Sequence, residues 1–534
     1  MRTLYTNGNV VTMDPIQPQA AALVTEGNKI IGLGDVPTMT KLAGEAAVVV
    51  DMKGGALFPG FIETHNHISM YALYRSYAYL GQCETINEVI AAMKAHADSR
   101  PQDPVVVGYS YDDTLTKDGR TLDRHDLDKV STDRPVFIIH ISAHLGFLNT
   151  PGLAHFNIDA QTPAPEGGAI HHDAQGEPTG RLDEMAFFAI PAQLGKPDVE
   201  TYTELLKASV AEYNRMGITA IHDAGLGLEG MSHTVMESYH RLLKSRDLNL
   251  RVFMSALVPE FEELSPAPFS GTMGEERFVM AGVKLFIDGS IQGETAALLE
   301  PYTSKPDWQG ELFTSREEFE ALVLKYHNAG HHITIHSNGD AAIETSITAV
   351  EKAQAACPRS NTRYMLIHAQ MAHTDHLQRM RRLGMIPSFF GYHVYNWGDR
   401  HRDIFIGPDR AARMNPAGEA EAMGLPFTLH VDTPVLPIQV IDSIHTAVNR
   451  TTRDGKILGP DQRTTAHAAV AAYTSTAAIC SFSENERGSL TPGKLADLTL
   501  VSQDMTTVPP ETIRDTQIWM TVLDGETVFK SSDL

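Results

Sequence analysis

Two hydrophobic patterns alternate along the middle of the chain. Between residues 61 and 432, short apolar runs are separated by longer stretches in which apolar residues recur at helical spacing. Ile86, Val89, Ile90 and Met93 form one such set, because residues three and four apart share a face of a helix. The short runs predict buried strands, and their alternation with helices predicts an α/β fold with a parallel sheet.

The predicted elements define an architecture. Strands are expected at residues 61–67, 104–108, 135–141, 218–223, 250–257, 279–289, 332–336, 363–368, 385–389 and 425–432. Helices are expected at residues 85–97, 197–215, 234–243, 316–329, 340–355 and 375–383. Residues 150–183, rich in glycine, proline and polar residues, predict a long loop. A parallel barrel with long inserted loops is favoured over a doubly wound open sheet, because no G-x-G-x-x-G motif follows the first strand.

Both ends of the chain carry a β pattern instead. Residues 4–13 predict two strands joined at an Asn7-Gly8 turn, and residues 22–34 predict a hairpin. After a helix at 466–474, further strands are expected at residues 497–501, 518–522 and 526–529. The two ends are expected to pair into one composite β domain beside the barrel.

Composition narrows the range of partners and compartments. The 534 residues are 42% apolar and 20% charged, enough to bury a large core, and the net charge of −23 argues against nucleic acid or an anionic membrane surface as a partner. Cys83, Cys357 and Cys480 are too far apart to suggest a disulfide framework, so a reduced, cytoplasmic protein is expected. No secretory signal pattern and no run of about 18 apolar residues is present, so no membrane association is expected.

Polar side chains mark the carboxyl ends of the predicted strands, where a barrel keeps its active site. His65 and His67 lie two apart and therefore face the same side of a strand. The full set comprises His65, His67, Lys284, His336, His368 and Asp432. Each residue alone is more often structural, but four imidazoles and a carboxylate in strand order are a ligand set for a divalent ion such as Zn²⁺.

Several of these stretches resemble a known family. The similarity lies in residues 59–67, 283–290, 335–340, 367–370, 431–435 and 488–498. They are similar to motifs of the amidohydrolase superfamily, and within it to amidohydrolase family 3, the branch that contains N-substituted formamide deformylase-like enzymes. Two positions differ from the usual pattern of that branch. His430 and Val431 precede Asp432 where Gly-Ser-Asp is usual, and Glu63-Thr64 stands where Asp-Ser or Asp-Thr is common.

The resemblance implies a distorted (β/α)₈ TIM barrel over residues 59–484 and a small composite β-sandwich built from residues 1–58 and 485–534. It implies that the four histidines bind a divalent metal, expected to be zinc, as one or two ions, and that Asp432 is both ligand and catalytic base. Lys284 corresponds to a lysine that is N-carboxylated in many members, where it bridges two metals. The predicted catalytic residues are Asp432, His368 and Lys284.

Loops around the barrel mouth supply the expected substrate contacts. His144 and Asn149 resemble a His…Asn pair of this branch, and the other candidates come from loops that can reach the mouth. The predicted substrate-binding residues are His144, Asn149, Asp113, Gln292, His393 and Trp397. The expected partner is a small molecule, and a homodimer is common among similar proteins.

The predicted activity is metal-dependent hydrolysis of a non-peptide C–N bond in an amide, an N-formyl amine or an N-acyl amine. A bound Zn²⁺ lowers the pKa of water toward about 7. Asp432 would accept the proton and then protonate the leaving nitrogen. One alternative is a deaminase or cyclic amidase that acts on a heterocycle at the same site. Another, of a different class, is a catalytically silent metal-binding barrel.

Overall fold

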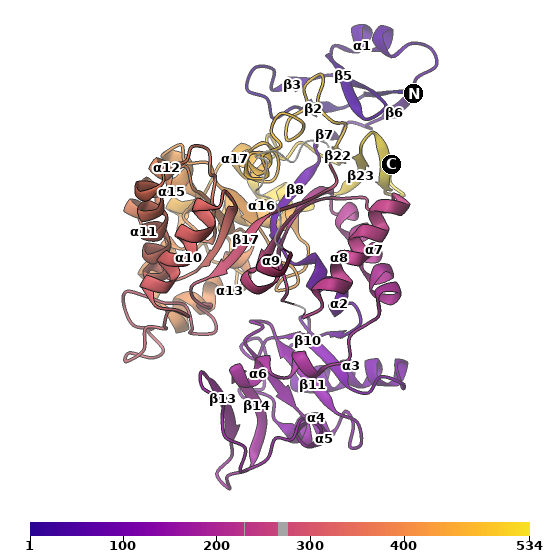
Figure 1. Ribbon diagram of the computed structural model, residues 1–534. Coiled ribbons are helices and arrows are strands. Elements are labelled where there is room, and N and C mark those ends of the chain that lie inside the picture. The colour runs from indigo at the N-terminus through magenta and orange to yellow at the C-terminus, as the bar shows by residue number, and fades with distance from the viewer. Residues whose placement is uncertain (229, 265–275) are drawn as a thin grey trace.

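An eight-stranded parallel sheet forms the centre of the computed structural model, which describes residues 1–228, 230–264 and 276–534 (Figure 1). Its strands, in order, are β8 (Phe61–Asn66), β15 (Ile218–Leu226), β16 (Arg251–Leu257), β17 (Phe278–Phe286), β18 (His332–Ser337), β19 (Met365–His368), β20 (Ile386–Phe390) and β21 (Thr428–His430). All neighbours are parallel. The Thr64 hydroxyl of β8 donates to the Thr428 hydroxyl of β21 at 3.0 Å. The sheet is therefore a nearly closed barrel, and the predicted (β/α)₈ fold is confirmed.

Helices cover the outside of this barrel (Figure 1). They are α7 (Val199–Arg215), α8 (Ser232–Ser245), α9 (Val258–Leu264), α10 (Arg316–Asn328), α11 (Asp340–Ala356), α12 (Thr374–Leu383), α13 (His393–Arg400), α14 (Pro408–Arg413), α15 (Ala417–Ala422), α16 (Val440–Asn449), α17 (Ala466–Ala471) and α18 (Ser475–Cys480). Local sequence fixes several ends. Ser315 and Glu318 form a capping box at the start of α10, and Gly384 ends α12 with φ of 66°. None of the helices in the described ranges is long and apolar enough to cross a membrane.

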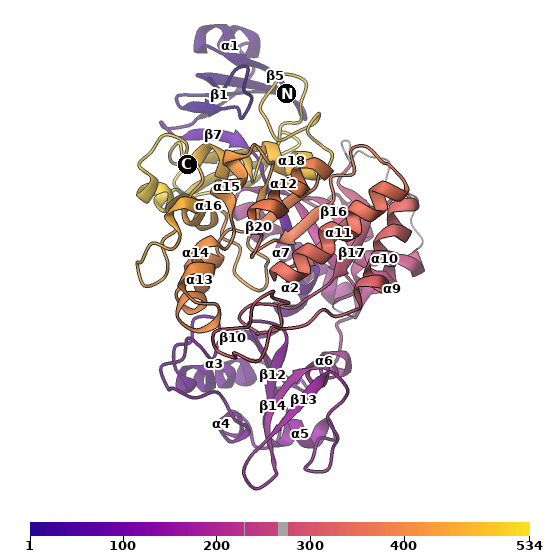
Figure 2. The same ribbon diagram turned by 90° about the vertical axis from the view of Figure 1, so that its left-hand side faces the viewer.

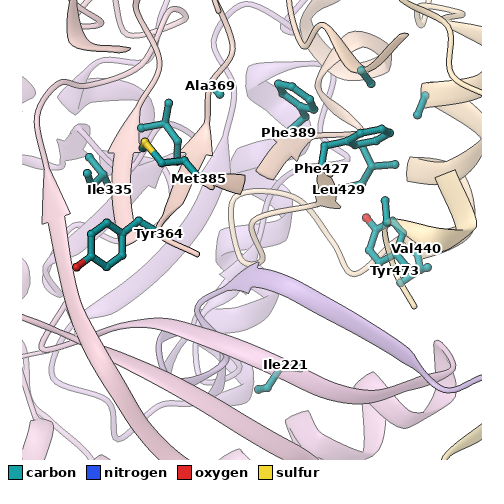
Figure 3. Packing of buried hydrophobic residues seen from close by; sticks show 14 of the residues in the cluster. Ile221, Ile335, Tyr364, Ala369, Met385, Phe389, Phe427, Leu429, Val440 and Tyr473 are labelled. Atoms are coloured by element: carbon teal, nitrogen blue, oxygen red, sulfur yellow. The ribbon is translucent and has the colours of Figure 1, made fainter. Parts of the chain in front are cut away.

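The main core lies between the barrel strands and these helices. Ile221, Ile335, Phe389 and Leu429 come from four barrel strands and are buried in one cluster with Val440 of α16 (Figure 3). Their burial holds the strand backbones in a fixed frame. The carboxyl ends of the strands are therefore presented at defined positions.

A second sheet interrupts the barrel between α2 (Ile68–Tyr74) and α7. It contains β9 (Ala78–Tyr79), β10 (Val106–Tyr111), β11 (Val136–His140), β12 (Leu145–Leu148), β13 (Gly168–His172) and β14 (Pro178–Glu184), with α3 (Ile86–Ser99), α4 (Arg124–Asp128), α5 (Thr150–His155) and α6 (Met185–Phe188) packed around it. The strands expected at 104–108 and 135–141 belong here, so their assignment to the barrel is wrong. They are buried and pair in parallel, which makes their apolar runs indistinguishable from barrel strands.

The prediction of a long loop at residues 150–183 is also wrong. Helix α5 starts after Asn149, and β13 and β14 pair as an antiparallel hairpin. Every residue of β13 is at least partly exposed, so the hairpin carries the polar residues and glycines that predict a loop.

The inserted sheet is attached to the barrel through the segment that follows β20. Arg400 of α13 pairs with Asp112, with Nη1 2.8 Å from Oδ2. Ile141, directly after β11, packs in a cluster with Phe390, Trp397 and Leu436. The inserted sheet lies at one end of the molecule and the terminal strands lie at the other (Figures 1 and 2).

Strands from both ends of the chain share one sheet, as expected. Its order is β24 (Glu526–Lys530), β23 (Ile518–Leu523), β22 (Leu498–Val501), β7 (Ala56–Pro59), β2 (Asn9–Val11) and β3 (Gln19–Ala20). A smaller sheet contains β5 (Lys29–Gly34), β4 (Ala22–Glu26), β1 (Arg2–Thr6) and β6 (Val48–Asp51), with α1 (Val36–Ala43) beside it. The β4–β5 hairpin is confirmed. The Asn7-Gly8 hairpin is wrong, because β1 and β2 enter different sheets. The boundaries at 58/59 and 484/485 remain a prediction.

A buried ionic network joins this terminal sheet to the barrel. Arg251, fully buried at the start of β16, places Nε 2.7 Å from Oδ2 of Asp497 and also pairs with Asp524. The backbone N–H of Asp524 donates to Asp497 at 3.0 Å. Arg277 pairs with Asp524 through Nη2 at 2.9 Å. Two arginines of the barrel are thus neutralised by two aspartates that flank β22 and β23.

Candidate metal centre

The barrel brings the predicted ligands together from distant parts of the chain. His65 lies in β8, His336 in β18 and His368 at the end of β19. His67 directly follows β8, and Asp432 lies two residues after the end of β21. Nε2 of His65 and Nε2 of His67 each lie 3.2 Å from Oδ1 of Asp432. Nε2 of His368 lies 3.8 Å from Oδ2 of Asp432 and 3.2 Å from Nδ1 of His336. His65, His67 and His368 thus lie around Asp432, and His336 lies beside His368.

These distances suit a divalent ion. Two ligands at bond lengths of about 2.0–2.1 Å and a tetrahedral angle are about 3.3 Å apart. The Asp432 contacts to His65 and His67 match that spacing, and the His336–His368 contact matches it as well. His65, His368 and Asp432 also form a group whose donor atoms all lie within 4.8 Å of one another.

The protonation states of the site favour a cation. Burial lowers the pKa of His65, His336 and His368, to about 3 for His336, so these imidazoles are neutral and can donate lone pairs. Burial alone would raise the pKa of Asp432, but the adjacent His65 and His67 hold it well below its usual range. An ionised carboxylate among neutral imidazoles leaves a buried negative charge that a metal ion would neutralise.

Lys284 lies in β17 next to this group. Its side chain is 1% exposed, and Nζ has no hydrogen-bond partner among the described residues. Burial lowers its pKa to about 7. A buried amine without a hydrogen-bond acceptor is unusual in a folded protein. It is expected where the amine carries a covalent modification that binds a metal ion.

Backbone groups and one buried carboxylate hold His336 in place. Nε2 of His336 lies 3.1 Å from the carbonyl oxygen of Gly289, which leaves Nδ1 facing the site. Asp288 accepts hydrogen bonds from the backbone N–H groups of Asn338, Gly339 and Ala297 at 2.8–3.0 Å. The loops after β17 and β18 are therefore fixed to each other beside the metal ligands.

Two other clusters of histidines and carboxylates in the described ranges are each paired with an arginine side chain. They are Asp112 with Asp113 and His140, and Glu344 with Asp375 and His376. Arg400 pairs with Asp112, and Arg379 pairs with Glu344 through Nη1 at 2.6 Å. Among the groups found in the described ranges, the one at the barrel mouth is therefore the strongest candidate for a metal site.

Three predicted substrate contacts lie close to the centre or carry free polar atoms. Burial is the main cause of the lowered pKa of His336, and His144 adds a small electrostatic contribution, while Nδ1 of His144 lies 3.0 Å from Glu184. His393 stacks on Phe390 and has no hydrogen-bond partner for either ring nitrogen within the described ranges. Gln292 has a buried Oε1 that is similarly unpartnered. These three remain candidates for substrate binding.

The other three are engaged elsewhere. Asn149 caps α5, because its Oδ1 accepts from the backbone N–H of Gly152. Oδ1 also accepts from the N–H of Val136, and Nδ2 donates to the carbonyl oxygens of Ser131 and Arg134. Asp113 accepts from His140, with Nε2 3.2 Å from Oδ1.

Trp397 is 1% exposed and packs in the cluster that joins the insert to the barrel. Its ring contacts His393 and Phe390, with ring centroids 5.0 and 6.1 Å apart, so Trp397 packs beside a retained candidate and offers no polar atom that is free of this cluster. The roles of Asn149, Asp113 and Trp397 in substrate binding remain predictions.

Other buried polar residues, absent from the predicted site, contact a ligand or carry unpartnered atoms. His430 contacts His368, with Nε2 3.1 Å from Nδ1. Gln370, His401 and Asn415 are buried and each has at least one polar atom without a partner in the described part of the chain. Gln370 lies two residues after His368 and His430 two residues before Asp432, whereas His401 and Asn415 carry no such signal in the chain.

Removal of a bound ion with a chelator is expected to lower the melting temperature and to abolish the hydrolysis predicted from the sequence, and added Zn²⁺ should restore both. An ion present at 1,000 times its Kd stabilises the folded chain by about 4 kcal/mol. Metal analysis, turnover and thermal unfolding measured on one sample check this. The same chelator saturated with zinc beforehand is the control. Unchanged turnover and melting temperature after the metal has been removed would rule out this centre as the catalytic site.

Comparison with known proteins adds sequence and structural relatives. The family model described as "Amidohydrolase family" matches residues 48–529. The N-substituted formamide deformylase of Arthrobacter pascens is 27% identical over 532 residues, covering 97% of this chain and 96% of that protein.

Two solved structures share the fold. An uncharacterized metal-dependent hydrolase from Pyrococcus horikoshii OT3 superimposes with a TM-score of 0.76 at 23% identity, covering 96% of this chain and 99% of the other. Atrazine chlorohydrolase TrzN from Arthrobacter aurescens TC1, complexed with zinc, superimposes with a TM-score of 0.53 at 13% identity, covering 99% and 95%. The resemblance identified from the sequence is confirmed.

Proposed function

The chain belongs to the amidohydrolase family, and from that premise we propose that it hydrolyses a non-peptide C–N bond in a small amide, N-formyl amine or N-acyl amine, with zinc as the metal. The observation that carries the proposal is the ionised Asp432, held 3.2 Å from two histidines in a buried ligand group. The deformylase relative, named for action on N-substituted formamides, supports the choice of bond.

The five residues of the ligand group have two roles in the proposed hydrolysis. His65, His67, His336, His368 and Asp432 would hold the ion, which when bound polarises a carbonyl oxygen and makes water a stronger nucleophile at neutral pH. Asp432 accepts the proton of the attacking water and passes it to the leaving nitrogen. The neutral imidazoles of His65, His336 and His368 keep the local charge low, so that negative charge developing on the carbonyl oxygen lies near one anion, Asp432.

Uncharged polar groups beyond the ligands favour an uncharged substrate. The unpartnered atoms of Gln292, Gln370, His393 and Asn415 include both donors and acceptors. Burial lowers the pKa of His393 to about 3, so its ring is neutral. Leaving such buried groups unpaired costs about 1–3 kcal/mol each, and a bound substrate with its own amide or hydroxyl groups would recover part of that cost.

A screen of N-formyl, N-acyl and cyclic amides with zinc-loaded and chelated protein tests this function. Release of an amine and a carboxylate, dependent on zinc, is the expected result. Release of ammonia from an amino-heterocycle would identify a deaminase instead. Turnover of no compound by protein that retains its metal would support a catalytically silent barrel. A cytoplasmic location and a homodimer also remain proposals, which cell fractionation and light scattering can test.

We also propose that Lys284 is N-carboxylated and that two ions are then bound. The supporting observations are its burial, its unpartnered Nζ and its pKa of about 7, which leaves a reactive neutral amine at ordinary pH. Protein prepared with ¹³C-bicarbonate is expected to show a carbamate carbon signal that is missing from Lys284→Met. Metal analysis should give two ions per chain for the first and one for the second. The same metal content in both, with no carbamate signal, would refute this assignment.

A further inference from the structure

His430 links the metal ligands to the polar interior of the barrel. It ends β21, is fully buried, and places Nε2 3.1 Å from Nδ1 of the ligand His368. Its other nitrogen, Nδ1, lies 2.9 Å from Oγ of Ser388 on β20. Both ring nitrogens therefore have a hydrogen-bond partner.

The chain of hydrogen bonds continues to the first strand. Oγ of Ser388 lies 3.2 Å from Oγ1 of Thr64 on β8. Thr64 in turn donates to the Thr428 hydroxyl at 3.0 Å and faces the Leu429 carbonyl oxygen at 3.3 Å. Four barrel strands that carry or adjoin metal ligands are thus connected by one series of polar side chains.

The direction of these hydrogen bonds follows from the role of His368. Its Nε2 faces His336 and Asp432 and must present a lone pair to bind an ion. A neutral imidazole has one N–H, so the hydrogen of His368 is on Nδ1 and is donated to His430. The hydrogen of His430 is then on Nδ1 and is donated to Ser388. Ser388 can donate to Thr64, and Thr64 donates onward, so each group gives one hydrogen and accepts one.

We propose that His430 is a positioning residue that fixes the tautomer and the ring orientation of His368 through Ser388 and Thr64, and that it thereby sets the affinity of the site for its metal. Acceptors that orient a metal-binding histidine are typically worth about 10- to 100-fold in metal affinity. A histidine that only filled space would be replaceable by any side chain of similar size, whereas this role requires an acceptor at the place of Nε2.

The decisive comparison is between His430→Leu and His430→Gln. Glutamine can keep an acceptor oxygen for His368, whereas leucine fills space and leaves the Nδ1–H of His368 unpaired. We expect His430→Leu to bind Zn²⁺ at least tenfold more weakly than His430→Gln, measured by competition with a chromophoric chelator. The visible spectrum of the Co²⁺-substituted protein should change in the leucine variant and be retained in the glutamine variant. These readouts report metal binding, so they stand whether or not hydrolysis is ever found.

His332→Leu is the matched control, because His332 is also a buried histidine of a barrel strand but bonds the Arg363 carbonyl instead of a ligand. Its Zn²⁺ affinity should equal that of the unaltered protein. A difference of less than tenfold between the leucine and glutamine variants at position 430 would overturn the proposal.

If His430→Leu does not fold, Zn²⁺ binding by variants of Ser388 tests the same proposal. Ser388→Ala removes the acceptor of His430, and Ser388→Thr keeps a hydroxyl. Weaker Zn²⁺ binding by the alanine variant than by the threonine variant supports the proposal, and equal binding overturns it.

Discussion

An Asp432→Asn variant is expected to lose about 10²- to 10⁴-fold in kcat/KM, the range that a positioned general acid–base group contributes. Asparagine has nearly the shape of aspartate but cannot accept the proton of the attacking water. It also removes the negative charge beside His65 and His67, so metal binding should weaken. Steady-state kinetics at saturating Zn²⁺, with metal content measured on the same sample, separate the two losses.

Asp247→Asn provides the control for this variant. Asp247 follows α8, and its side chain is 42% exposed. In the described ranges, its carboxylate pairs with Lys207 and accepts a hydrogen bond from Ser245. Its loss should leave kcat/KM unchanged within twofold. If Asp432→Asn retained more than a tenth of the activity with its metal bound, the assignment of Asp432 as the base would fail.

An Arg251→Leu variant is expected to lower the free energy of unfolding by about 3–5 kcal/mol, because it removes the arginine that hydrogen-bonds the buried Asp497. Urea unfolding measures the loss, and hydrogen exchange in β22 should locate it at the terminal sheet. A double variant with Asp497→Leu removes both charges and should recover part of the stability. Stability equal to that of the unaltered protein would show that the network contributes nothing.

Acidic pH gives a second measure of the same network. Burial alone would raise the pKa of Asp497, but Arg251 holds it below the usual carboxyl value. The stabilisation is therefore complete above that usual value and is lost as the pH falls through the lowered pKa. Arg251→Leu should flatten this part of the pH profile. The exposed pair of Lys352 and Glu320 is the control, since Lys352→Ala should cost less than about 1 kcal/mol.

The barrel and the ligand group were predictable because both rest on strong local patterns. An apolar strand that ends in a histidine or aspartate, repeated along the chain, places those side chains at one end of a parallel barrel. The inserted sheet was not predictable, since β10 and β11 are as apolar and buried as barrel strands. The sheet that a strand joins depends on contacts between distant segments. The hydrophobic periodicity of a sequence reports only on local structure and does not predict those contacts.

Positions of side chains within the mouth were harder to predict for the same reason. An asparagine side chain can bind a substrate or cap a helix, and the sequence around Asn149 does not distinguish these two roles. The structure shows that Asn149 caps α5. The partnership of His430 with His368 joins residues 62 positions apart, on strands separated by β20. Neither residue carries a sequence signal for the other.

Strand β7 is synthesised long before the strand that completes its sheet. It ends at Pro59, and its antiparallel neighbour β22 begins at Leu498. A ribosome adding about 5–20 residues per second needs roughly 20 to 90 s to cover that interval. Until then one edge of β7 stays unpaired, directly before the strand that carries His65. The native partner of that edge is therefore absent for most of the synthesis of the chain, so the terminal sheet is completed only after the whole barrel has been made.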